Sequence, residues 1–129
     1  MGISQGFIGE WEHESATTRK CLERVPQDQL TWQPHEKSMS IGDLAGHIVN
    51  MSTLWTDKTL NQDVFDMHPP GGEPFESPKV TSVQALLADF DQGVSKAAAD
   101  MAAMDDSKWM VNWSLANGGQ TLMTMPRVP

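Results

Sequence analysis

The chain has one cysteine, no tyrosine and few basic residues. Cys21 has no second cysteine for an intrachain disulfide, and no CxxC motif or Cys/His cluster with metal-binding spacing surrounds it. We therefore expect Cys21 to be a small core residue rather than a nucleophile or a ligand. This cysteine usage is typical of the reducing cytoplasm, where we expect the protein to work.

Long apolar runs are also absent. No stretch reaches the roughly 18 consecutive apolar residues of a membrane span, and the N-terminus lacks the basic and then apolar order of a secretory signal. Nine Lys and Arg against 17 Asp and Glu give a net charge of -8 and a pI near 4.7. Such a field repels phosphate backbones and anionic lipid, so we predict no nucleic-acid partner and no membrane partner.

What the chain does contain fits one compact domain over residues 1–129. Its 129 residues are close to the commonest domain size, and 39% of them are hydrophobic. Five Trp and nine Met are a large share for this length, and they need a core or an interface.

Apolar spacing predicts a first helix over residues 3–25. Its stripe comprises Phe7, Trp11, Thr18, Leu22 and Val25. Pro26 ends the helix, because the residue before proline is pushed out of helical geometry. Residues 26–35 show no helical period, and we interpret them as a loop anchored by Leu30 and Trp32.

The second helix has the clearest start signal. Ser40 can cap the first turn, with Asp43 three residues later as in a capping box. The apolar stripe of this helix comprises Ile41, Leu44, Ile48, Met51 and Trp55. His47 falls on the edge of that stripe, so the pattern predicts a polar ring that points toward the core.

Residues 66–78 hold four prolines and two adjacent glycines, which predicts an irregular crossing. A third helix is expected from Thr81, with Gln84 in the reciprocal capping position. Its apolar face comprises Val83, Leu86, Leu87, Phe90, Val94, Ala97, Met101 and Met104. Beyond residue 106, alternation and an Asn-Gly-Gly turn predict a hairpin, whose Trp109 and Trp113 must pack on a helix or another chain.

The candidates for metal chemistry are four histidines: His13, His35, His47 and His68. A metal site needs three or more ligands, and no two of these histidines share a helix face within four residues. Glu10 and His13 have the Glu-x-x-His spacing of di-iron bundles, but no second copy follows, which favours a solvated helix face.

Two interpretations of His47 remain open on spacing alone. It could be a partly buried histidine satisfied by one hydrogen bond, with Asp43 as its partner, or it could be a metal ligand. The sequence has no phosphate-binding glycine loop, no serine nucleophile elbow and no basic aromatic patch.

Three segments together resemble the DinB/YfiT-like family: Leu22-Glu23-Arg24-Val25-Pro26, then Leu30-Thr31-Trp32-Gln33-Pro34-His35-Glu36-Lys37-Ser38, then Ser40-Ile41-Gly42-Asp43-Leu44-Ala45-Gly46-His47-Ile48. The resemblance implies an all-α, up-down four-helix bundle that is often a homodimer. On this basis we expect three long helices and a short C-terminal β-hairpin. The fourth helix would be missing or supplied by a partner chain.

The same resemblance implies a divalent metal, zinc or nickel, held by three histidines, of which the first corresponds to His47. The other two normally form a His-x-x-x-His pair on the fourth helix, and no histidine follows His68 here. The implied function is a metal-dependent transferase or hydrolase that acts with a low-molecular-weight thiol, with an incomplete metal site in this chain. The alternative is a metal-free, non-catalytic homo-oligomeric helical domain, or a small-molecule binding module for an apolar ligand.

Overall fold

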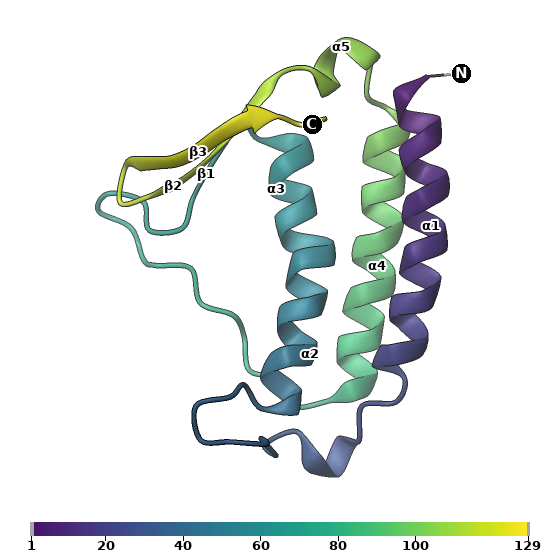
Figure 1. Cartoon of the computed structure of the whole chain (residues 1–129), viewed down its shortest axis with the longest axis vertical. Helices are drawn as coiled ribbons and strands as arrows, with labels where there is room; N and C mark the ends of the chain where they lie inside the picture. Colours follow the sequence, from purple (N-terminus) through teal and green to yellow (C-terminus); the bar gives the residue numbers. More distant parts are fainter. Residues whose placement is uncertain (1, 129) are drawn as a thin grey trace.

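The computed structural model describes residues 2–128 and shows long helices side by side, with a small sheet at one end (Figure 1). The helices are α1 (Ile3–Leu22), α2 (Ile41–Asn50), α3 (Thr56–Asn61), α4 (Val83–Ala102) and the short α5 (Asp106–Trp109), and the strands are β1 (Val64–Asp66), β2 (Asn112–Asn117) and β3 (Gln120–Pro126). A π-helical turn, Met51–Trp55, joins α2 to α3. The two helices therefore form one continuous rod, which we call the α2–α3 rod.

The first helix ends at Leu22, three residues before the predicted end, and a turn with the Val25 N–H on the Leu22 carbonyl leads into Pro26. The predicted core position of Cys21 is wrong, because its side chain is exposed. The loop includes a short 3-10 turn, Gln27–Gln29. Leu30 is half-buried in this loop, whereas Trp32 is 53% exposed and does not act as the predicted anchor.

The predicted start of the second helix is confirmed, since the Ser40 hydroxyl accepts a hydrogen bond from the Asp43 N–H at 3.0 Å. The predicted buried face is only partly right, because Ile48 packs against the core but is not fully buried. The buried positions of α2 are Gly42, Ala45, Gly46 and Val49, whereas Leu44 and Met51 are nearly half exposed. Small residues occupy these buried positions because they allow neighbouring segments to pack closely against α2. A Cβ on Gly46, for example, would lie 2.9 Å from Val80.

Helix α4 lies between α1 and the α2–α3 rod (Figure 1). Its cap is Ser82, whose hydroxyl accepts from the Ala85 N–H, so the predicted Thr81 and Gln84 pair is wrong. The Gln27 side chain fixes this start instead, because its amide donates to the Thr81 carbonyl and accepts from the Val83 N–H. The predicted stripe holds for the four buried residues of α4: Leu86, Phe90, Ala97 and Met101.

Two core clusters follow from this arrangement. The first lies where α1, α2 and α4 meet, and it comprises Leu22, Ala45, Val49, Leu86 and Phe90. The second lies nearer the sheet and comprises Leu60, Ala97, Met101 and Trp109. Trp109 stacks on Phe7 with ring centroids 5.0 Å apart and donates its indole N–H to the Ser4 hydroxyl. The requirement that Trp109 and Trp113 be packed is therefore met within one chain, where they are 4% and 7% exposed.

The predicted hairpin is confirmed as β2 and β3, and a strand that the sequence did not indicate joins it. Strand β1 pairs parallel to β2, so the strand order is β1-β2-β3. The Asp66 carboxylate fixes the hairpin turn by accepting from the N–H groups of Gly118 and Gly119, both of which have positive φ. Partial desolvation raises the pKa of Asp66, but the backbone N–H groups of His68, Gly119 and Gly118 outweigh it and hold the pKa below its usual value.

The sheet corrects the all-α prediction, and residues 2–128 contain no fourth long helix that would close a bundle. Arg127 ties the end of β3 to the α2–α3 rod. Its guanidinium, 1% exposed, donates to the carbonyls of Thr59, Val111 and Gln62 and to the Asp63 carboxylate. Within the same residues, no helix is long and apolar enough to cross a membrane.

Candidate functional site

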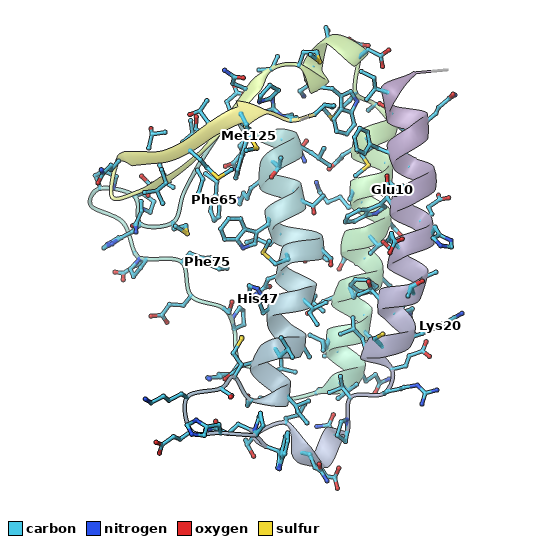
Figure 2. The ribbon with its side chains drawn as sticks, in the orientation of Figure 1. Glu10, Lys20, His47, Phe65, Phe75 and Met125 are labelled. Carbon is cyan, nitrogen blue, oxygen red and sulfur yellow. The ribbon has the colours of Figure 1, made fainter. Side chains whose placement is uncertain are left out.

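The candidate ligand His47 lies on the outward side of α2, and its side chain is exposed. The prediction that this ring points toward the core is wrong, because α2 turns its small residues toward its neighbours. His47 borders an open pocket of about 250 Å³ between α2 and the proline-rich crossing, lined by Met39, Asp43, Gly46, His47, Ser77, Pro78 and Lys79. Figure 2 shows His47 on the side of α2 that faces this crossing. The imidazole is therefore open to a ligand from outside.

Asp43 does not serve as the partner of His47. Its carboxylate accepts a hydrogen bond from the Lys79 ammonium at 3.1 Å. This bond from Lys79, followed by the interaction with Ser40, holds the pKa of Asp43 below its usual value. Asp43 thus ties the proline-rich crossing to the start of α2 and leaves His47 without the predicted carboxylate.

The other three histidines lie elsewhere on the molecule. His13 is exposed on α1 beside the exposed Glu10, which agrees with a solvated helix face. His35 is exposed in the loop before α2, where its Nδ1 accepts from the Lys37 N–H at 3.1 Å. His68 is exposed just after β1. Over residues 2–128 no three His, Cys, Asp or Glu side chains come together as a metal site.

The donor set therefore does not fit a complete catalytic metal centre in one chain, which takes three protein ligands and an open position. His47 is exposed and accessible, but it could supply only a single ligand. No chemical step through a metal follows from these residues alone.

A second feature is an ion-pair cluster between the α2–α3 rod and α4. Lys96 donates to Asp57 and to Asp100, and Asn61 donates to the same two carboxylates. The hydrogen bonds from Lys96 lower the pKa values of Asp57 and Asp100 and raise that of Lys96. The cluster borders a cavity of about 330 Å³, but its charges satisfy one another. The cluster is best explained as a set of ion pairs and hydrogen bonds that joins the α2–α3 rod to α4.

The third feature is an apolar groove of about 440 Å³ between the sheet and the helices. Its lining residues are Met51, Trp55, Thr56, Thr59, Leu60, Met101, Trp109, Trp113, Leu115 and Met123. The Met and Trp content of the sequence indicates a core or an interface, but it does not indicate that β2 and β3 form one wall of a groove. Strand pairing sets that wall, and the register between two strands gives no local sequence signal.

Comparison with known proteins gives one positive finding. The sequence model of the DinB superfamily matches residues 10–128. This match covers α2 with His47, α4 and all three strands. No curated protein and no solved structure matches the chain.

Proposed function

The chain belongs to the DinB superfamily, and we propose that it acts as a metal-dependent transferase or hydrolase that uses a low-molecular-weight thiol. In this proposal His47 supplies one ligand to a zinc or nickel ion. The observation that carries it is the exposed imidazole of His47 on an open pocket, at the position where the family resemblance expects a ligand. Cytoplasmic location, where such thiols are abundant, is part of the proposal.

The remaining ligands must come from outside residues 2–128 of one chain, and we propose a second copy as their source. Each copy carries the exposed His35 and His68 in addition to His47, whereas His13 lies on a solvated face of α1. Two His47 residues alone would give only two ligands, fewer than the three of a catalytic zinc site. The proposed homodimer therefore has to bring another donor of the partner next to His47.

The test is a titration of metal-free protein with Co²⁺, a spectroscopic stand-in for zinc, followed by visible absorption. We expect saturable binding, and we expect His47→Ala to weaken it by more than about tenfold because a direct ligand is removed. His13→Ala is the matched control, since it removes an exposed imidazole from α1. The sedimentation mass should rise from monomer to dimer as metal is added. Binding that His47→Ala leaves unchanged would contradict the proposal.

Activity is a separate readout. With metal bound, the protein should accelerate loss of free thiol from glutathione mixed with an electrophile such as chlorodinitrobenzene, and His47→Ala should abolish the acceleration. Glutathione serves here only as a representative small thiol. Metal binding without thiol consumption would leave His47 as a ligand and would remove the transferase part of the proposal.

A further inference from the structure

One buried polar group has no partner within residues 2–128. Trp113 is only 7% exposed, and its indole N–H is fully enclosed. Within these residues the N–H nevertheless has no hydrogen-bond acceptor. An unsatisfied buried donor destabilises the folded state, so native proteins rarely keep one without a reason. The neighbouring Trp109 shows the usual outcome, because its N–H donates to the Ser4 hydroxyl at 2.9 Å.

Trp113 is also one of the side chains that line the apolar groove. In the sheet, Trp113 is opposite Met125 and Leu115 is opposite Met123, so these four side chains share one face. On β1, the other neighbour of β2, Phe65 is opposite Leu115. The Phe65 ring meets the Trp55 ring edge-on, with ring centroids 5.0 Å apart. This contact turns the shared face toward the α2–α3 rod.

The groove is lined by uncharged, mostly apolar side chains. Among its lining residues, the hydroxyls of Thr56 and Thr59 donate to the carbonyls of Met51 and Trp55 in the π-helical turn. Its volume of about 440 Å³ falls within the roughly 300–1,000 Å³ typical of small-molecule sites. Met51 and Met123 at its opening are 46% and 39% exposed, and methionine side chains adapt readily to a bound molecule.

We propose that this groove binds an uncharged, mainly aromatic or aliphatic small molecule whose oxygen acceptor receives the N–H of Trp113. Because this N–H is enclosed, the side chains around it must move aside for such an oxygen to reach it. The site needs no metal. It lies along the same α2–α3 rod as His47, with Met51 four residues further on.

A matched pair of fluorescent probes tests the proposal. Prodan is an uncharged naphthalene that carries a ketone, and 2-(dimethylamino)naphthalene is its analogue without the ketone. We expect prodan to bind saturably with a blue-shifted emission. It should bind roughly three- to tenfold more tightly than the analogue, the ratio that one neutral hydrogen bond gives. Chelator is present throughout, so that a failed metal site and a failed groove remain distinguishable.

Two neighbouring variants locate the bound probe. Met123→Glu places a charge at the groove and should weaken prodan binding by more than about tenfold. Leu122→Glu places the same charge one residue earlier, on a side chain that is 55% exposed and does not line the groove, and should leave binding unchanged.

Three results would overturn the proposal. Equal effects of the two glutamates would place the probe elsewhere on the protein. Equal affinity for the two probes would remove the role of the Trp113 N–H. A dimer of the wild-type chain that Met123→Glu converts to monomer, with no prodan binding to either form, would show that a second copy fills the groove.

Discussion

Replacing Gly93 by alanine perturbs a close approach between α4 and the α2–α3 rod. A Cβ at this position would lie 2.1 Å from Cγ2 and 2.4 Å from Cβ of Thr53. Carbon atoms in contact lie about 3.5 Å apart or more, so the two helices must separate by roughly 1 Å. Thr53 cannot easily move aside, because it is β-branched and its hydroxyl donates to the Val49 carbonyl at 2.7 Å.

The magnitude follows from two opposing terms. Alanine in a helix gains about 1 kcal/mol over glycine, whereas overpacking of a tight contact costs about 1–3 kcal/mol and sometimes more. Because the contact at Gly93 involves a stiff side chain and backbone, we place the cost at the upper end. We expect a net loss of about 2 kcal/mol in the free energy of unfolding. In a domain of this size that lowers the Tm by roughly 8 °C.

The assay is thermal and urea unfolding followed by circular dichroism. Gly6→Ala and Gly9→Ala are matched controls on α1, where an added Cβ meets nothing within 4 Å. Each control should raise the free energy of unfolding by about 0.5–1 kcal/mol. Thr53→Ala in the Gly93→Ala background should restore only part of the loss, since the Thr53 Cβ remains. If Gly93→Ala stabilised the protein as the controls do, the packing of α4 on this rod would be refuted.

Three further predictions concern other parts of the molecule. Lys96→Met should cost at most about 1 kcal/mol at pH 7, because Lys96 is exposed and its pairs with Asp57 and Asp100 are only partly shielded from solvent. Since Lys96 lowers both carboxyl pKa values, its stabilisation is present above pH 4 and is lost as the pH falls below their usual value of 3.8. The variant and the wild type should therefore converge in urea unfolding at low pH. Arg127→Lys should lose about 2–3 kcal/mol and loosen β3 in hydrogen exchange, because an ammonium cannot reach all four acceptors; an unchanged unfolding midpoint would contradict this. Cys21 should react with a thiol reagent in the native protein as fast as in urea, and slow native labelling would mean that it is buried.

The long helices could be predicted from local signals. Ser40 at the start of α2 and the buried Leu86, Phe90 and Met101 of α4 follow rules that act within a few residues. The buried face of α2 could not be predicted in this way. The large apolar residues of α2 suggested a core face, but the tight contacts of this helix required Gly42, Ala45 and Gly46 instead. Burial there is decided by the neighbouring segments, which local spacing does not encode.

The site was predicted only in part, for a similar reason. Local sequence features identified His47 as a candidate site residue. They did not predict its orientation, which depends on which face of α2 is buried. The hydrogen bond that engages Asp43 comes from Lys79, which is 36 positions away in the sequence. The unpaired N–H of Trp113 depends on strand pairing. Neither leaves a local sequence pattern. The strand β1 was missed because three residues carry too little periodicity to be distinguished from a loop.

The role of His47 is tested by the metal content per chain in untagged protein, determined by elemental analysis together with the mass in solution. We predict about one zinc or nickel per chain or per dimer in a dimeric protein, and loss of that metal in His47→Ala. A stable protein that contains no stoichiometric metal, or that keeps its metal without His47, would contradict the role proposed for this histidine.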